Sequence, residues 1–264
     1  MMNFDLPFIP ERPEKSRDHG LTMMMDKGLS VGEIEDFIEA CGDYTDVVKF
    51  GFGTSLITAN LETKLNLYRE AEITPFFGGT LFEAFIARDK FEDYQRFLDK
   101  YDMTLAEISD GSIVLPHDQK LAYIQKLGEQ VTVLSEVGSK AADVHLSSDQ
   151  WVEQMKTELE AGVWKVIAEA RESGTIGIYN KDGSANVELI DSIRNHVKLE
   201  NVLWEAPQKN QQVWFIQEMG ANVNLGNIAP NEVISLEALR LGLRGDTFFE
   251  FLAPQMIEQY SHKY

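Results

Sequence analysis

Eight short apolar runs recur along this chain, and their recurrence limits the folds that it can adopt. Each run is too short and too rich in β-branched residues for a helix, and each leads through Gly, Pro or Asx into an amphipathic stretch. This pattern is typical of buried parallel strands that alternate with helices. The runs are LTMMMDKG (21–28), VVKFGFGTS (47–55), ITPFFGGT (73–80), MTLAEISDG (103–111), VTVLSEVGSK (131–140), VWKVIAEARESG (163–174), NVLWEAP (201–207) and NVNLGNI (222–228).

The segments between these runs place apolar residues at helical spacing. The strand starts lie about 20 to 38 residues apart, which is the scale of a βα unit. Eight strands alternating with eight helices predict an α/β fold, a closed (β/α)8 TIM barrel in a single domain. The alternative, an open doubly wound sheet, is less favoured because the first turn, DKGLS, lacks its glycine-rich fingerprint. The expected helices span 30–42, 54–71, 81–101, 117–130, 147–162, 186–197, 209–220 and 231–243.

The 264 residues suit one barrel, which we expect to span 20–248. The proline-containing segment 1–19 is interpreted as an N-terminal arm. The aromatic-rich tail, 249–264, either packs on the barrel or contacts a partner subunit, and we expect a homo-oligomer.

Composition excludes several classes of partner. The net charge of −19 leaves no basic excess to replace phosphate counterions, so nucleic acid is not an expected partner. No apolar run approaches the roughly 20 residues that cross a bilayer, so no membrane contact is expected. A single cysteine, Cys41, allows no internal disulfide and is compatible with a reducing compartment. We therefore expect a cytoplasmic protein.

Carboxylates follow the fourth to seventh strands at equivalent places, where a barrel builds its active face. Such oxygen donors suit Mg²⁺, although a ring of ion pairs with Lys and Arg is the alternative. No His or Cys cluster accompanies them, which argues against zinc. We expect Glu107 to take part in catalysis together with Lys49, Lys140 and Arg171, and the expected metal ligands are Glu136, Glu169, Glu205 and Asp26.

Cations lie near the same strand ends. Lys27 and Lys49 are embedded in apolar strand sequence, so each either pairs with a carboxylate or binds a phosphate or carboxylate ligand. Lys140 follows the fifth strand, where a loop lysine can reach over the barrel mouth and act as an acid. Arg171 offers a planar fork for carboxylate, phosphate or sulfite oxygens.

Two glycine-rich segments, FFGGT (76–80) and NLGNI (224–228), are expected to present backbone N–H groups to an anion. The glutamine-rich start of the seventh helix either adds anion contacts or caps that helix. The expected substrate-binding residues here are Gly79, Thr80, Asn224, Gly226 and Asn227.

The strand ends and the last helix carry the motifs KFGFGTS, GGTLFE, EISDG, EVGSK, EARESG, WEAPQKNQQ and VNLGNIAPNEVISLEALRLGLRGDT. Together, over residues from about 20 to about 248, these motifs resemble the phosphosulfolactate synthase family, and LGLRGDT is the most family-specific of them. The resemblance implies a Mg²⁺-dependent carbon–sulfur lyase that adds sulfite to phosphoenolpyruvate, giving 2-phospho-3-sulfolactate for coenzyme M.

The resemblance also implies roles for four side chains. Lys140 would protonate the substrate carbon, Arg171 would bind sulfite, and Lys27 and Lys49 would bind phosphate or carboxylate. Because bacterial and plant relatives include heat-stress-associated proteins, two alternatives remain. One is a lyase or aldolase for another phosphorylated enol or keto acid, and the other is a non-catalytic stress protein on the same barrel.

Overall fold

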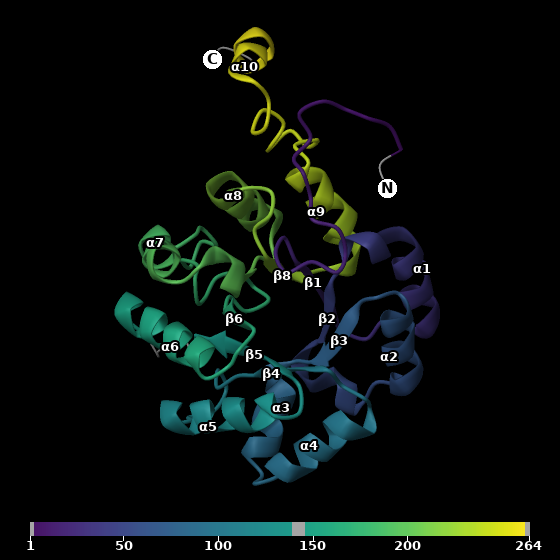
Figure 1. Ribbon diagram of the computed structural model, residues 1–264, viewed down its shortest axis with the longest axis vertical. Helices are drawn as coiled ribbons and strands as arrows, with labels where there is room; N and C mark the ends of the chain where they lie inside the picture. The colour runs from purple at the N-terminus through teal and green to yellow at the C-terminus, as the bar shows by residue number, and fades with distance from the viewer. Residues whose placement is uncertain (1–2, 139–145, 262–264) are drawn as a thin grey trace.

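The computed structural model describes residues 3–138 and 146–261. Eight parallel strands form one sheet in the order β3-β2-β1-β8-β7-β6-β5-β4, with helices around it (Figure 1). The predicted (β/α)8 barrel is confirmed. The strands are β1 (Thr22–Asp26), β2 (Val47–Phe50), β3 (Thr74–Phe77), β4 (Leu105–Ile108), β5 (Thr132–Val137), β6 (Lys165–Ala168), β7 (Val202–Glu205) and β8 (Leu225–Ile228).

The sheet is nearly closed. Strands β3 and β4 sit at the two ends of the strand order, and no hydrogen-bonded ladder joins them in the described part of the chain. We call this joint the β3–β4 seam. Almost every strand residue is buried, because the barrel interior covers one face of the sheet and the helices cover the other.

The helices follow the predicted amphipathic segments, with one clear difference. The single helix expected over 81–101 is two helices, separated at 87–90, where Asp89 has a φ of 54°. A left-handed backbone cannot continue an α-helix. The α-helices are α1 (Val31–Cys41), α2 (Leu61–Glu70), α3 (Gly79–Ile86), α4 (Phe91–Lys100), α5 (His117–Gly128), α6 (Ser148–Glu160), α7 (Val187–His196), α8 (Lys209–Met219), α9 (Val233–Arg240) and α10 (Pro254–Tyr260).

Side chains of the N-terminal segment are tied to the end of the barrel where the strands begin. Arg12 donates to Glu237 on α9 at 2.9 Å, and Arg17 pairs with Asp46, just before β2, at 3.0 Å. Lys15 donates to the carbonyl oxygens of Gly42 and Ala71, which end α1 and α2. These contacts place the segment across the amino ends of the strands, away from the carboxyl ends.

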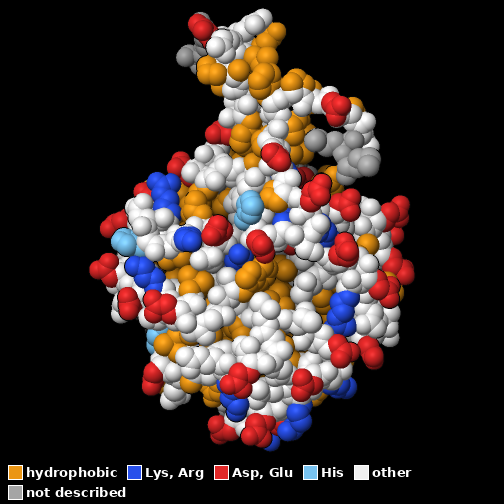
Figure 2. All heavy atoms as spheres, in the orientation of Figure 1, with side chains coloured by type: hydrophobic (Ala, Val, Ile, Leu, Met, Phe, Trp, Pro, Cys, Tyr) orange, Lys and Arg blue, Asp and Glu red, His pale blue; other side chains and the backbone are white. Residues whose placement is uncertain are grey.

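The C-terminal segment divides into two parts. Thr247 donates to the carbonyl of Leu239 at 2.8 Å, and Phe251 packs against the core. Helix α10 stands away from the barrel, and hydrophobic side chains lie along this projection (Figure 1 and Figure 2). Among the described residues, no helix combines the length and the apolar character that a bilayer crossing requires.

Candidate active site

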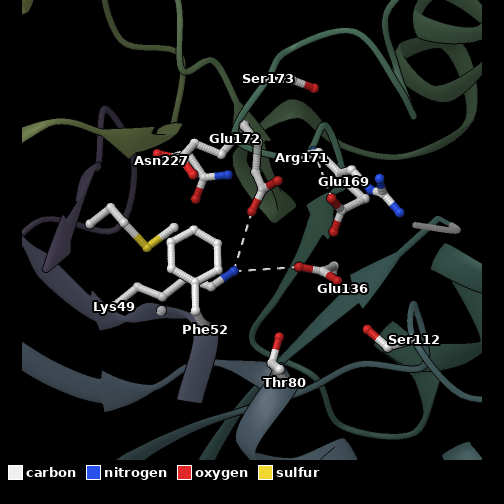
Figure 3. Close-up of a pocket in the computed structure, with 13 residues that line it drawn as sticks. Lys49, Phe52, Thr80, Ser112, Glu136, Glu169, Arg171, Glu172, Ser173 and Asn227 are labelled. Carbon is white, nitrogen blue, oxygen red and sulfur yellow. Dashed lines mark hydrogen bonds and ion pairs between the residues drawn. The ribbon is translucent and has the colours of Figure 1, made fainter. Parts of the chain in front are cut away.

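A cavity of about 480 Å³ opens at the carboxyl ends of the strands (Figure 3). Its lining mixes carboxylates, two cations, hydroxyl groups and one aromatic ring. The lining residues are Met25, Lys49, Gly51, Phe52, Thr80, Ser112, Glu136, Glu169, Arg171, Glu172, Ser173, Glu205 and Asn227. This end of a parallel barrel is where barrel enzymes bind their substrates.

Three glutamates converge in this cavity from neighbouring strands. Glu136 lies on β5, Glu205 ends β7, and Glu169 directly follows β6. All three are buried, and one carboxylate oxygen from each lies within 4.8 Å of the others. Buried oxygen donors at this spacing suit a hard divalent cation such as Mg²⁺. We call these three residues the glutamate triad.

Backbone and side-chain bonds orient the triad. A carboxylate oxygen of Glu205 accepts from the N–H of Ala170 at 3.0 Å, and one of Glu169 accepts from the N–H of Arg171 at 2.6 Å. The ammonium of Lys120, on α5, donates to the carbonyl of Glu136 at 2.7 Å. The triad is therefore held in place by neighbouring elements, which favours a site with fixed geometry.

Lys49, on β2, points into the same cluster. Its Nζ atom lies 3.0 Å from Glu107, 3.4 Å from Glu136 and 3.3 Å from Glu205. Burial acts to lower the pKa of Lys49, but Glu107, Glu205, Glu136 and Glu169 together raise it well above its usual 10.5. The raised pKa favours the protonated, cationic form of Lys49 at neutral pH.

Glu107 faces Lys49 with one oxygen and crosses the β3–β4 seam with the other. Its Oε1 atom accepts from the N–H of Gly79, at the start of α3, at 2.8 Å. Beside it, Ser109 donates to Glu83 of α3, whose other oxygen accepts from the N–H of Ser112 at 2.9 Å. Side-chain bonds thus connect the two sides of the seam.

Gly79 is held close to this carboxylate. A Cβ atom at Gly79 would lie 2.2 Å from Ser109 Oγ and 2.8 Å from Glu107 Oε1. The close approach explains the glycine there, and the N–H expected to bind an anion instead donates to Glu107. The neighbouring Thr80 lines the cavity.

Asp26 ends β1 but lies outside the glutamate triad. Its oxygens accept from the N–H groups of Gly28 at 2.7 Å and Leu29 at 2.9 Å, and from the hydroxyl of Tyr68 at 3.0 Å. These bonds shape the turn after β1. The sequence DKG carries this signal, because an Asp side chain readily accepts from the backbone N–H two residues further along a turn, here that of Gly28.

Lys27, in the same turn, is partly exposed and pairs with Glu172 in the loop after β6. Glu172 lines the cavity, so the pair lies at its rim. The structure therefore supports the pairing interpretation of Lys27. Its expected role in substrate binding stays a prediction.

The segment NLGNI differs from the expected turn, because Leu225–Ile228 is strand β8 itself. Asn224 precedes this strand, at the opposite end from the cavity, and its side chain bonds to Leu21, Glu200 and Val202. Gly226 lies within the strand, where a Cβ would approach Met23 to 2.5 Å. The strand predicted over 222–228 is therefore confirmed as Leu225–Ile228, in register with β7, whereas the expectation that 224–228 presents its N–H groups to an anion from a glycine-rich turn is wrong.

Asn227 does reach the cavity. It adopts a φ of 57° near the end of β8, and its Oδ1 atom has no hydrogen-bond partner among the described residues. A buried amide oxygen of this kind is suited to accept a hydrogen bond from a ligand or water.

Arg171 begins the loop after β6, with an exposed side chain and a φ of 45°. It lines the cavity beside Glu169 (Figure 3). Lys140, the expected acid, lies outside the described residues.

The cavity also includes Phe52 and Ser112, which the sequence did not single out. Phe52 takes a φ of 56° inside the GFG segment, and two flanking glycines are the only hint of an unusual backbone there.

A nearly closed parallel barrel with a buried acidic cluster and cations at its carboxyl end defines a (β/α)8-barrel enzyme with a site for anionic substrates. The sequence profile of the (2R)-phospho-3-sulfolactate synthase family matches residues 10–246. The chain therefore belongs to this family of carbon–sulfur lyases.

Relatives with curated names agree with this membership. The chain is 42% identical to phosphosulfolactate synthase of Bacillus subtilis (strain 168) over 94% of its own length and 100% of that protein. It is also 42% identical to phosphosulfolactate synthase of Methanocaldococcus jannaschii, over 87% of this chain and 94% of that one. A plant relative, Protein HEAT-STRESS-ASSOCIATED 32 of Arabidopsis thaliana, is 22% identical over 87% of this chain and 88% of that one.

Solved structures agree with the fold. A 3-hexulose-6-phosphate synthase from Salmonella typhimurium superposes with a TM-score of 0.55 at 10% identity, covering 85% of this chain and 100% of that one. Another 3-hexulose-6-phosphate synthase gives a TM-score of 0.53 at 14% identity, covering 83% and 98%. At such identities the similarity shows a shared barrel and nothing of the reaction.

Proposed function

We propose that this protein catalyses the Mg²⁺-dependent addition of sulfite to phosphoenolpyruvate, giving (2R)-2-phospho-3-sulfolactate. The observation that carries the proposal is the buried glutamate triad at the barrel mouth, beside Arg171, in a chain of this family. The reaction joins two anions, so a site for it needs positive charge close to a cation-binding cluster.

In the proposed reaction, the sulfur lone pair of sulfite attacks the methylene carbon of phosphoenolpyruvate and forms the C–S bond. The electrons of the double bond move toward the adjacent carboxylate, and a proton is then delivered to the carbon that bears both the phosphate and the carboxylate, which completes the addition. The product keeps its phosphate, so no leaving group departs.

The glutamate triad has the donor chemistry to hold Mg²⁺: three buried carboxylates with converging oxygens. Bound there, Mg²⁺ would supply positive charge against the substrate carboxylate as negative charge builds on it. Asp26, also expected as a ligand, is instead engaged by Gly28, Leu29 and Tyr68, which argues for assigning the site to the triad alone.

The cations take different parts in this proposal. Lys49 stays protonated and balances the charge of the cluster, beside Glu107. Arg171 binds a sulfite oxygen pair through its planar fork. Lys140 delivers the proton to carbon, an assignment that rests on the EVGSK motif alone. Thr80 and Asn227 contact substrate oxygens, a role supported by their position in the lining of the cavity.

The test is to incubate the purified protein with phosphoenolpyruvate, sulfite and Mg²⁺, and to follow the phosphate esters by ³¹P NMR and the product by mass spectrometry. We expect a sulfonate product that is absent in excess EDTA. A folded sample that forms no sulfonate with Mg²⁺ would overturn the proposal, and turnover of other phosphorylated enol or keto acids would then redefine the substrate.

The proposal includes a cytoplasmic location and a homo-oligomer. The aromatic side chains Phe248 and Tyr260 of the C-terminal segment are 48% and 64% exposed, which suits contact with a second subunit. Light scattering on the eluate of a size-exclusion column measures the assembly directly, and a monomeric mass would contradict this part.

A further inference from the structure

The loop between β6 and α7 carries Arg171, Glu172 and Ser173 to the cavity. The chain then folds back onto the end of β6, where the N–H of Ile178 donates to the carbonyl of Glu169 at 3.1 Å. At Gly177 a Cβ would lie 1.8 Å from that carbonyl oxygen, so the fold-back requires glycine. The segment that carries Arg171 is therefore a compact loop that packs against Glu169, directly after β6.

Gln211, on the first turn of α8, holds this loop from the side. Its side chain is 2% exposed, and its Nε2 atom donates to the carbonyl of Gly174 at 2.7 Å and of Gly183 at 3.1 Å. Its Oε1 atom accepts from the N–H of Gln208 at 3.1 Å, which caps the helix. One amide therefore connects two points within the loop, Gly174 and Gly183, to α8.

These bonds continue from Gln211 to the glutamate triad. The N–H of Gly174 donates to the carbonyl of Arg171 at 3.1 Å, and the N–H of Arg171 donates to a carboxylate oxygen of Glu169 at 2.6 Å. Gly174 has a φ of 63°, and a Cβ there would lie 2.5 Å from the Gln211 amide nitrogen. The backbone of Arg171 is thus fixed between a buried amide and a candidate metal ligand.

We propose that Gln211 is a positioning residue for anion binding: it presets the conformation of the loop that carries Arg171. The inference rests on the proposed function for the assignment of Arg171 to sulfite. An exposed arginine on a free loop would lose conformational freedom on binding an anion, whereas a loop already fixed by Gln211 loses less.

The neighbouring Gln212 provides a matched control. It lies on the same helix, is 1% exposed, and donates through Nε2 to the carbonyl of Ala206 at 3.2 Å. Its side chain donates to the segment after β7 and not to the loop after β6. Gln212→Met removes a buried glutamine donor of the same kind, while leaving the bonds of Gln211 in place.

Two substitutions separate the loop contact from the helix cap. Gln211→Met removes both, whereas Gln211→Glu keeps an oxygen to accept from Gln208 and removes the amide donor to Gly174 and Gly183. We expect both variants to bind sulfite about 10-fold more weakly in calorimetric titrations, because two hydrogen bonds to the loop are lost. The Michaelis constant for sulfite should rise similarly, with the constant for phosphoenolpyruvate and the affinity for Mg²⁺ changing less than about 2-fold.

Limited trypsin digestion measures how accessible the loop is to protease and does not depend on enzymatic activity. Arg171 and Lys181 are both exposed cleavage sites in it. We expect faster cleavage there in both Gln211 variants and wild-type rates in Gln212→Met. Unchanged cleavage and sulfite affinity in Gln211→Met, or equal effects in Gln212→Met, would overturn the proposal. If the wild-type protein forms no sulfonate, the proposed function fails, while digestion and titration still decide the role of Gln211.

Discussion

The ammonium nitrogen of Lys49 lies 3.0 Å from one carboxylate oxygen of Glu107, whose other oxygen accepts from the N–H of Gly79 at 2.8 Å. A cation on β2 is thereby joined through a carboxylate on β4 to the start of α3. The same side chain belongs to the charged cluster in the cavity and to the closure of the barrel. Glu107 is therefore expected to affect both the stability of the barrel and the chemistry of the cavity.

Replacing Lys49 with Met is expected to lower the free energy of unfolding by about 3–5 kcal/mol, because it leaves buried carboxylates without their cation. Chemical denaturation followed by circular dichroism measures the loss. Lys90→Met serves as the control, since Lys90 is 60% exposed and pairs with Asp93 on the surface. Equal stability of the wild type and Lys49→Met would show that the cation contributes nothing to the folded state.

The pH dependence of this effect follows from the raised pKa of Lys49. A pKa above its unfolded value of 10.5 means that the stabilisation is fully present below that pH and is lost only as pH rises through the folded pKa. The difference between the wild type and Lys49→Met should therefore stay constant from about pH 8 to about pH 10. Denaturation curves across this range measure it, and a steady decline within it would contradict the raised pKa.

Substitution of Glu169 by Gln should abolish stabilisation by Mg²⁺. In the wild type, Mg²⁺ at 100 times its dissociation constant is expected to add about 2.7 kcal/mol to the stability, and EDTA should reverse the effect. Glu172→Gln is the control, because Glu172 lies at the exposed rim outside the triad. The melting temperature of each protein, measured with and without Mg²⁺, tests this prediction. If Mg²⁺ raises the melting temperature of Glu169→Gln as much as that of the wild type, the cation is bound by other ligands.

Gly79→Ala is expected to destabilise the protein by about 1–3 kcal/mol, because its methyl group would overlap Ser109 and Glu107. Gly128→Ala, at the end of α5, is the control, since a Cβ there meets nothing within 4 Å. The control should be neutral or slightly stabilising. Parallel urea titrations of the two variants distinguish the two positions. Similar stabilities of Gly79→Ala and Gly128→Ala would mean that the residues around Gly79 shift to accommodate a methyl group at little cost.

Lys27→Ala tests whether the rim lysine acts on the substrate or only on Glu172. The two side chains are 43% and 54% exposed, so loss of their pair should change stability by less than about 1 kcal/mol. If Lys27 binds substrate, the variant should have a higher Michaelis constant for phosphoenolpyruvate than the wild type. The difference between the two constants should be larger at low salt, where charges are less screened. An unchanged constant would leave Lys27 with the ion pair alone.

The sequence predicted the strands and the triad because both depend on a local pattern. Buried runs fix the strands, and Glu136, Glu169 and Glu205 occupy equivalent places at successive strand ends. Asp26 also ends a strand, but its carboxylate accepts hydrogen bonds from a local turn and lies outside the triad. Whether a strand-end carboxylate bonds to its own turn or joins a site shared with other strands depends on the geometry of a few hydrogen bonds. The spacing of residues in the sequence does not encode that geometry.

The remaining differences depend on long-range structure. Asn224 was expected at the mouth, but the exact start of β8 is set by its pairing with β7 and β1. The break between α3 and α4 and the cavity position of Phe52 both depend on left-handed residues. Non-glycine residues adopt that conformation only when tertiary packing compensates for it, so the sequence carries little sign of it.

The seam between β3 and β4 has an evolutionary consequence. Since Glu107 closes the joint through Gly79, a descendant that lost the reaction would still be selected to keep this glutamate for folding. Its retention across homologues would then report ancestry of the barrel and not activity. Glu169 does not lie at the seam. Substitution at that position is therefore the better marker of a relative that has lost catalytic activity.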